Sequence, residues 1–139
     1  MNKLPKFDDS LLLRTDFAND AAWAELCAAA QAESGYGFRA YVDCIDDPSY
    51  GGLTVDQLVA LASDGGYITF AFLADRRALT DPERPILVVD LHDEPGRTFR
   101  VIPAAMWIVE NNLSIANADF EDYAGAVDAD GVFRGFPDD

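Results

Sequence analysis

The chain has 139 residues and a formal net charge of −15, from 10 Lys and Arg against 25 Asp and Glu. Half of its residues are hydrophobic and 12% are aromatic, which excludes a disordered chain and provides for a buried core. The negative charge argues against direct binding to nucleic acids or anionic membranes, since both are bound by cation-rich surfaces. No apolar run approaches the roughly 18 residues of a membrane span.

The two cysteines are too few for a disulfide scaffold, and no CxxC motif is present. We expect Cys27 and Cys44 to be small core residues of a protein in a reducing compartment. The N-terminal MNKLPKFDD lacks the apolar segment of a signal peptide, so we expect a cytoplasmic protein. We also expect one globular domain over residues 1–139, with loose ends at 1–9 and 136–139.

Predicted strands and helices alternate in the first half of the chain and then give way to a hairpin followed by helices. The predicted strands cover 11–16, 38–45, 67–74, 86–92 and 98–102, and helices follow Asn19, Thr54, Pro103 and Asn117. Leu11–Leu13 form a continuous apolar run, which predicts burial on both faces of the first strand. Asn19 can cap its helix, and Thr54 with Gln57 has the spacing of a capping box.

This order, β-α-β-α-β-β-β-α-α, predicts an α/β domain with a mixed, mostly parallel five-stranded sheet flanked by helices. An α+β fold is the alternative. The order loosely resembles the thioredoxin-like arrangement, including Pro85 just before the hairpin, but the redox motif is missing. The connection at 75–85 is interrupted by Pro82 and Pro85, which disfavours a full helix there.

Three aspartates follow the first three predicted strands, namely Asp16, Asp46 and Asp75. Ligands of open α/β sheets bind at the carboxyl ends of parallel strands, and carboxylates there could hold Mg²⁺ or Ca²⁺. The simpler interpretation is that these residues end strands and cap helices, because no spacing matches a defined metal motif. We assign no cofactor.

Asp90 and His92 project from the same face of the fourth predicted strand. A carboxylate beside an imidazole suits general acid or base catalysis, and Arg97 or Arg100 could then clamp an anionic substrate. The alternative is a strand-end histidine with a structural hydrogen bond. The sequence contains no GxSxG, no HExxH and no phosphate-binding glycine loop.

The charges are distributed unevenly along the chain. Half of the ten cations lie between positions 76 and 100, namely Arg76, Arg77, Arg84, Arg97 and Arg100. From Asp119 onward, seven acidic residues stand against one base, Arg134. These arginines could receive an anionic ligand, but we favour pairing with the protein's own acidic residues.

Aromatic and amide side chains near loops and helix ends are candidate contacts for a partner. The candidate anchors are Tyr36, Tyr50 and Trp107, with Asn111 and Asn112 beside the last of them. Adjacent asparagines are poor in helix interiors, so capping of a tight turn is the structural alternative for this amide pair.

Five segments together resemble a known family. They are Ser10-Leu-Leu-Leu-Arg-Thr-Asp-Phe17, Gly52-Leu-Thr-Val-Asp-Gln-Leu58, Val89-Asp-Leu-His-Asp-Glu-Pro-Gly-Arg-Thr-Phe-Arg100, Val109-Glu-Asn-Asn-Leu-Ser-Ile-Ala-Asn117 and Asp130-Gly-Val-Phe-Arg-Gly-Phe136. The resemblance is to small actinobacterial proteins defined as a domain of unknown function, and it covers nearly the whole chain. It implies a stand-alone cytosolic domain, with no activity or site residue to carry over.

Charge, size and the lack of a recognisable catalytic set favour a non-enzymatic module that binds a basic protein partner. An antagonist of a basic enzyme, similar in role to an immunity protein, is one concrete form. The alternative is a small enzyme or ligand-binding protein that uses Asp90, His92, Arg97 and Arg100. A third hypothesis is a structural accessory domain, either monomeric or dimeric through its hairpin edge.

Overall fold

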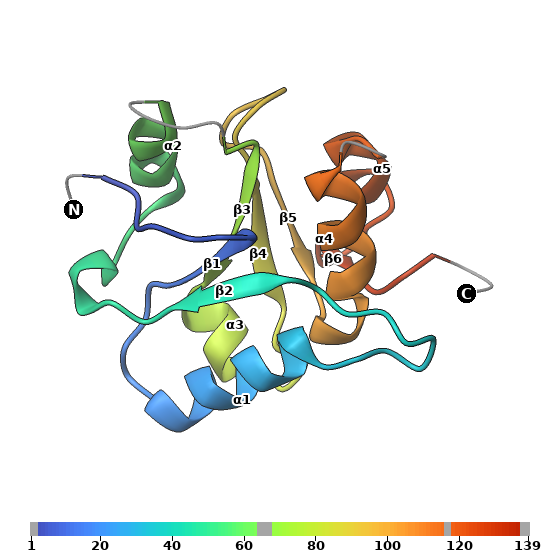
Figure 1. The fold of residues 1–139 in the computed structure, drawn as a ribbon, viewed down its shortest axis with the longest axis horizontal. Helices are drawn as coiled ribbons and strands as arrows, with labels where there is room; N and C mark the ends of the chain where they lie inside the picture. The colour runs from blue at the N-terminus through green and yellow to red at the C-terminus, as the bar shows by residue number, and fades with distance from the viewer. Residues whose placement is uncertain (1–2, 64–67, 116–117, 137–139) are drawn as a thin grey trace.

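A computed structural model describes residues 3–63, 68–115 and 118–136 (Figure 1). Six strands form one sheet in the order β2-β1-β3-β4-β5-β6. The strands are β1 (Ser10–Arg14), β2 (Val42–Ile45), β3 (Phe70–Ala74), β4 (Ile86–Asp90), β5 (Thr98–Val101) and β6 (Val132–Phe133). The β1–β2, β1–β3 and β5–β6 pairs are parallel, whereas β4 is antiparallel to both of its neighbours. The predicted α/β class with a mixed, mostly parallel sheet is therefore confirmed.

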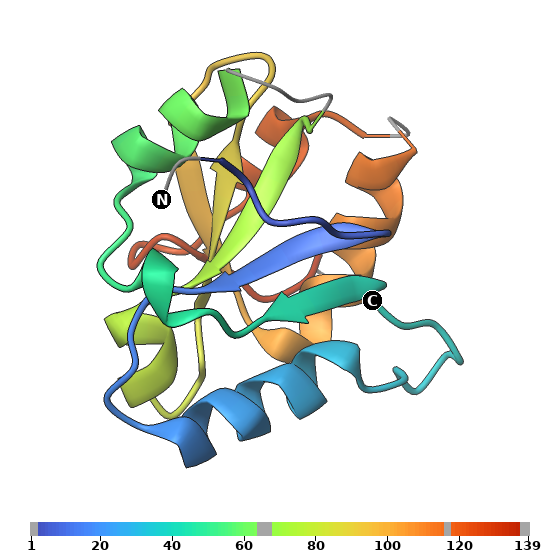
Figure 2. The same cartoon turned by 60° about the vertical axis from the view of Figure 1, so that its left-hand side comes forward.

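Helices cover both faces of this sheet. They are α1 (Asp20–Gln31), α2 (Val55–Ser63), α3 (Arg76–Thr80), α4 (Met106–Ser114) and α5 (Phe120–Ala124), with single 3₁₀ turns η1 (Pro48–Tyr50) and η2 (Pro103–Ala105). The core on one face contains residues of α1, α3, α4 and α5. The core on the other face contains residues of α2 and η1. In Figure 1, α2 lies across the sheet from α4 and α5, and the turned view shows α1 running beside the edge strand β2 (Figure 2).

The leucines of β1 show why this strand lies inside the sheet. Leu12 belongs to the first core, whereas Leu11 and Leu13 belong to the second, as the two-residue period of a strand requires. All three are completely buried. The prediction of burial on both faces is confirmed.

Two of the predicted helix starts are also confirmed. Asn19 accepts a hydrogen bond from the Ala22 amide at 3.0 Å and so caps α1. Thr54 and Gln57 exchange side-chain and backbone hydrogen bonds at 3.0 and 3.1 Å before α2. The predicted start of the last helix, Asn117, lies outside the described residues, and α5 begins at Phe120 after a capping box formed by Asp119.

The predicted strand over 38–45 is shorter in the structure, because residues 38–41 leave the sheet. Gly37 has a φ of +84°, and the Ser34 amide donates to the Phe38 carbonyl at 2.6 Å, which closes a loop. The Tyr41 amide then donates to the buried Glu110 carboxylate at 2.7 Å. Phe38 consequently points outward, with 53% of its surface exposed.

Two short elements were not expected from the sequence. The connection after β3 contains the five-residue helix α3, which ends before Pro82 and is capped by Asp75 through the Ala78 amide at 3.1 Å. A sixth strand, β6, lies beside β5 through bonds from Arg100 N to Gly131 O at 2.9 Å and from Ile102 N to Phe133 O at 3.3 Å. The sheet therefore has six strands rather than five.

The N-terminal segment packs against the second core through Leu4 and Phe7, next to α2. Within residues 3–63, 68–115 and 118–136, no helix has the length and hydropathy of a membrane-spanning segment.

Candidate functional site

An arginine fills the space at the ends of β1 and β2, where the sequence suggested a metal ion. Arg14 is buried, and its guanidinium donates to Asp20 Oδ1 at 2.8 Å, to Asp46 Oδ1 at 3.2 Å and to the Asp16 carbonyl at 2.9 Å. The Asp16 carboxylate accepts from the Ala18 amide at 3.0 Å. These contacts give Asp16 and Asp46 structural partners.

Asp75, the third candidate for metal binding, is held by Arg100. The two side chains form paired bonds at 2.9 and 2.7 Å, and Arg100 also donates to the Pro85 carbonyl at 2.9 Å. Burial raises the pKa of Asp75, but the bonds from Arg100 and the Ala78 amide outweigh it and lower the pKa overall. Among the described residues, no group of three or more His, Cys, Asp or Glu side chains could hold a metal ion.

Asp90 organises the turn after β4. Its buried carboxylate accepts hydrogen bonds from the amides of His92 at 2.9 Å, Asp93 at 3.3 Å and Glu94 at 2.9 Å. The His92 side chain is 71% exposed, and its Nε2 lies 3.9 Å from an Asp93 carboxylate oxygen. The structure thus uses Asp90 as the acceptor for a turn and places the imidazole of His92 on the surface.

Two of the remaining arginines of the 76–100 region, Arg84 and Arg97, pair with acidic residues of the same chain. Arg97 contacts Glu94 at 3.3 Å and also pairs with Glu121, while Arg84 contacts Glu25 at 2.8 Å. Internal pairing, which the sequence analysis favoured over ligand capture, is therefore present at Arg84 and Arg97, as it is at Arg100.

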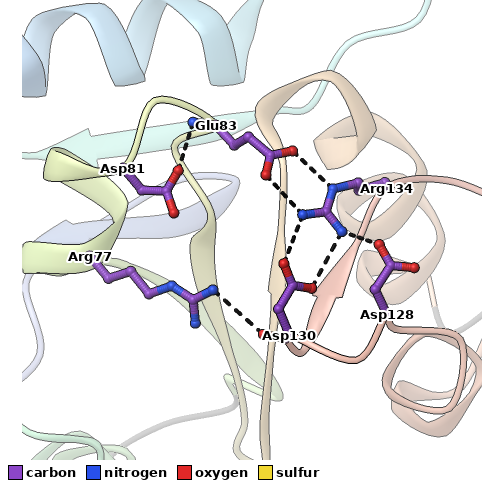
Figure 3. A network of polar contacts seen from close by, with 6 residues as sticks. All are labelled: Arg77, Asp81, Glu83, Asp128, Asp130 and Arg134. Atoms are coloured by element: carbon purple, nitrogen blue, oxygen red, sulfur yellow. Dashed lines mark hydrogen bonds and ion pairs between the residues drawn. The ribbon is translucent and has the colours of Figure 1, made fainter.

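A denser ion-pair network ties the acidic end of the chain to the loop after α3 (Figure 3). Arg134 donates to both Glu83 oxygens at 2.9 Å and to Asp130 at 2.9 Å, and it also pairs with Asp128. The hydrogen bonds with Glu83 and Asp130 raise the pKa of Arg134, and the same contacts lower the pKa values of both carboxyls. Arg77 adds a contact to the Asp130 carbonyl at 3.5 Å.

An exposed aromatic cluster lies on a different part of the surface. Phe38 stacks on Trp107 with ring centroids 5.3 Å apart and an interplanar angle of 13°. Tyr36 lies 6.1 Å from Trp107 at 52°. Tyr36 is 69% exposed and Phe38 is 53% exposed. We call Tyr36, Phe38 and Trp107 the open cluster.

Beside the open cluster is a pocket of about 620 Å³ between the end of α1, the loop after it, and the start of α4. Its lining consists of Ala29, Ala32, Glu33, Ser34, Gly35, Tyr36, Glu83, Arg84, Ile102, Pro103, Ala104 and Trp107. This volume is within the range of ligand-binding clefts. The lining combines two aromatic rings with two carboxylates and one guanidinium that is already paired with Glu25.

The loop that carries Tyr36 is shaped by Ser34. The Ser34 hydroxyl accepts hydrogen bonds from the amides of Tyr36 and Phe38, each at 3.2 Å, and the Ser34 carbonyl accepts from Gly37 at 3.0 Å. These local bonds turn the chain after α1 and bring the two rings to the side of α4.

A second pocket, of about 450 Å³, follows along α4 and includes Asn111, Tyr41 and Ile115 in its lining. Asn111 lies one helical turn after Trp107, so both side chains project from the same side of α4. Glu110 also lines this pocket, and its buried carboxylate accepts from the Ser10 hydroxyl at 2.7 Å.

The other two proposed contact residues lie elsewhere. Asn112 donates to the Ile108 carbonyl at 2.8 Å and also hydrogen-bonds Tyr123, which directs it into the helix packing. Tyr50 is buried in the second core, and its hydroxyl donates to the Lys3 carbonyl at 2.8 Å. The structure therefore brings together Tyr36 and Trp107, with Asn111 one turn away.

Sequence reasoning missed Phe38, Glu33 and Glu83 as residues of this surface. Alternating polarity predicted a strand over 38–45 that includes Phe38, and only the Gly35 and Gly37 pair signalled that the strand starts later. Glu83 reaches the pocket from a loop almost fifty residues away along the chain, so no local pattern could reveal it.

The fold and this surface define an α/β protein with one mixed sheet and an exposed aromatic pocket at the start of α4. The model of a family described as a domain of unknown function, DUF6924, matches residues 9–136, and the chain belongs to that family. No curated protein matches the chain.

Proposed function

We propose that this chain is a non-enzymatic binding module that docks on a basic protein through the open cluster and the adjoining side of α4. The observation that carries the proposal is the exposure of Tyr36 and Phe38 around Trp107. Aromatic rings dominate the energetic centres of protein interfaces, and exposed apolar patches mark interaction surfaces.

The charge distribution supports a basic partner. Five arginines are paired with acidic residues of the chain, and because 25 acidic residues stand against 10 basic ones, these pairs neutralise only part of the acidic surface. With a net charge of −15, long-range attraction accelerates encounter with a cationic protein and repels nucleic acid. An antagonist of a basic enzyme is the concrete form of this function that we favour.

The test is recovery of a stoichiometric complex from extracts of the source organism, using the full chain as bait. We expect a partner of high isoelectric point at about 50 mM salt and a marked loss of it at about 500 mM. The bait variant Trp107→Ala should lose the partner. Asp56→Asn on α2 should retain it, because Asp56 is exposed on the far side of the sheet.

Size-exclusion chromatography of the purified pair then separates a defined complex from loose charge attraction. If no stoichiometric partner is recovered, or if the partner is acidic, the proposal is overturned. Equal capture by the wild type and by Trp107→Ala would overturn the assignment of this surface.

We also propose a cellular compartment and a source for the protein. Both Cys27 and Cys44 are free thiols, which supports a reducing compartment such as the cytoplasm. The resemblance of the sequence to small actinobacterial proteins supports an actinobacterial source.

A further inference from the structure

We infer that the pocket beside Tyr36 and Trp107 is a receptor for one arginine side chain of the partner. This inference rests on the proposed function and makes it more specific. It assigns to the pocket a ligand chemistry, a guanidinium group, that is recognised by two aromatic rings and a neighbouring carboxylate.

The rings are arranged to leave aromatic surface facing the pocket. Phe38 stacks on Trp107 at 5.3 Å and 13° but does not contribute to the pocket lining, whereas Tyr36 and Trp107 both do. Tyr36 is inclined at 52° to Trp107 with the centroids 6.1 Å apart. A cation held against the face of a tryptophan is attracted by the ring quadrupole, and tryptophan is the best aromatic residue for this contact.

The charges of the pocket lining favour a cation. Glu33 and Glu83 both line the pocket, and its one guanidinium, that of Arg84, is already bonded to Glu25 at 2.8 Å. Glu83 is held by Arg134. Within the described part of the chain, Glu33 has neither a hydrogen bond nor an ion pair, so its carboxylate is available to an incoming cation.

The molecule already holds guanidinium groups against aromatic rings at two other places, and at Arg14 a carboxylate takes part as well. Arg14 lies 4.4 Å from the ring centroid of Phe17 and 5.7 Å from that of Trp23, while one of its guanidinium nitrogens donates to Asp20. Arg39 lies 5.4 Å from the Tyr41 ring, close in sequence to the open cluster. The pocket offers the pairing of ring and carboxylate seen at Arg14, and no arginine among the described residues lies over the Trp107 ring.

Arginine fits this chemistry better than lysine. Its planar guanidinium stacks on aromatic faces, is less strongly hydrated than an ammonium group and can bond a carboxylate with two nitrogens. A pocket of about 620 Å³ also leaves space for the neighbouring backbone of the partner.

The test uses a blocked tripeptide, acetyl-Gly-Arg-Gly-amide, titrated into the ¹⁵N-labelled full chain. We expect a saturable shift of the Trp107 indole signal with a dissociation constant of the order of 1 mM, as suits a single side chain. The matched neutral peptide, with citrulline in place of arginine, should bind at least about tenfold more weakly. The buried Trp23 indole serves as an internal reference.

Three variants locate the effect. Tyr36→Ala and Glu33→Gln should each lower the affinity for the arginine peptide several-fold. Neither is expected to impair folding, because both side chains are exposed. Asp56→Asn removes the same charge as Glu33→Gln at a distant site and should leave the peptide affinity unchanged. Equal losses in Asp56→Asn and Glu33→Gln would show only general charge attraction and would overturn the inference.

The outcomes separate this inference from the proposed function. One outcome is a stoichiometric complex with a basic partner that depends on Trp107, while neither peptide shifts the indole signal. That result would support the proposed function and overturn the inference that the pocket binds arginine. A shift with the citrulline peptide equal to that with the arginine peptide would also overturn it. Self-association of the chain that is lost in Glu33→Gln would overturn it as well, because the occupant would then be a second copy.

Discussion

The protein has two aromatic clusters that differ in what covers them. The closed cluster consists of Phe99, Phe120, Tyr123, Phe133 and Phe136, and its ring centroids lie 4.9 to 6.3 Å apart. Its first four members are at most 5% exposed, whereas Tyr36 and Phe38 of the open cluster are more than half exposed. The open-cluster centroids lie 5.3 and 6.1 Å apart, within the range of the closed cluster, so the spacing of the rings does not distinguish the two.

The difference is in the supporting elements. Two strands and a helix, β5, β6 and α5, enclose the closed cluster from several sides. The open cluster is built from one loop laid against the start of α4, and no further segment among the described residues covers Tyr36 and Phe38. We therefore expect the closed cluster to determine stability and the open cluster to determine binding.

The largest loss of stability should come from Phe133→Ala. Phe133 is completely buried, and its ring contacts Tyr123 and Phe136. Removing a buried phenylalanine leaves a cavity and should lower the free energy of unfolding by about 3–5 kcal/mol. Urea denaturation followed by circular dichroism measures this loss. A change below about 1 kcal/mol would show that the closed cluster does not support the fold.

A smaller and pH-dependent loss is expected from Asp75→Asn, which breaks the bond between α3 and β5. At pH 7 the free energy of unfolding of this variant should be lower by about 2 kcal/mol. The loss is smaller than for a fully buried ion pair because the Asp75 side chain is 28% exposed. The pKa of Asp75 is lowered in the folded state from its ordinary 3.8. The carboxylate therefore stabilises the fold above that ordinary value and loses the effect as the pH falls through the folded pKa.

Urea denaturation of the wild type and of Asp75→Asn at pH 7 and at pH 3 checks the direction of this pH dependence. The difference in the free energy of unfolding between the two proteins should be smaller at the lower pH. A difference that widened on acidification would contradict the assignment of the Arg100 contact as the source of the shift.

The opposite pattern is expected from Tyr36→Ala in the open cluster. The Tyr36 side chain is 69% exposed, so the free energy of unfolding should change by less than about 0.5 kcal/mol. Affinity for the basic partner should fall by about tenfold, as for a residue beside an aromatic energetic centre. Calorimetric titration measures the affinity, and thermal unfolding of the same sample is the control. A large stability loss would remove the distinction between the clusters.

The smallest effects should come from Arg134→Gln, which lies between the two regions. Arg134 follows β6 and bonds Glu83 (Figure 3). Glu83 also lines the pocket of the open cluster. The variant should be slightly less stable at low salt and unchanged at high salt, because its contacts are exposed ion pairs. Released from Arg134, Glu83 should strengthen binding of the arginine tripeptide about twofold. Weaker binding would contradict that role for Glu83.

The features that the sequence predicted well depend on neighbours along the chain. The Leu11–Leu13 run, the Asn19 cap and the Thr54 capping box each involve residues within four positions, so pattern and spacing sufficed. The missed features depend on distant contacts. The Tyr41 amide donates to Glu110, which is 69 positions away, and β6 forms by pairing with the edge of β5.

The same limit applies to the candidate site. Tyr36 and Trp107 could each be named as anchors from their places near a loop and a helix end, but their proximity arises from the packing of α1 beside η2. Arg14 was overlooked because a charged residue at the end of an apolar strand is usually exposed. Here Asp20 and Asp46 compensate its burial, and the guanidinium of Arg14 occupies the position suggested for a metal.

The parallel pairing of β6 with β5 has a consequence for the order of events during synthesis. Residues 98–101 leave the ribosome about thirty positions before Val132 and Phe133, which complete the sheet. Until then Tyr123, which packs against Phe99, lacks the ring of Phe133 that contacts it in the finished molecule. A nascent chain halted before position 132 thus holds an unfinished aromatic core with an open strand edge, which is the kind of surface that chaperones bind.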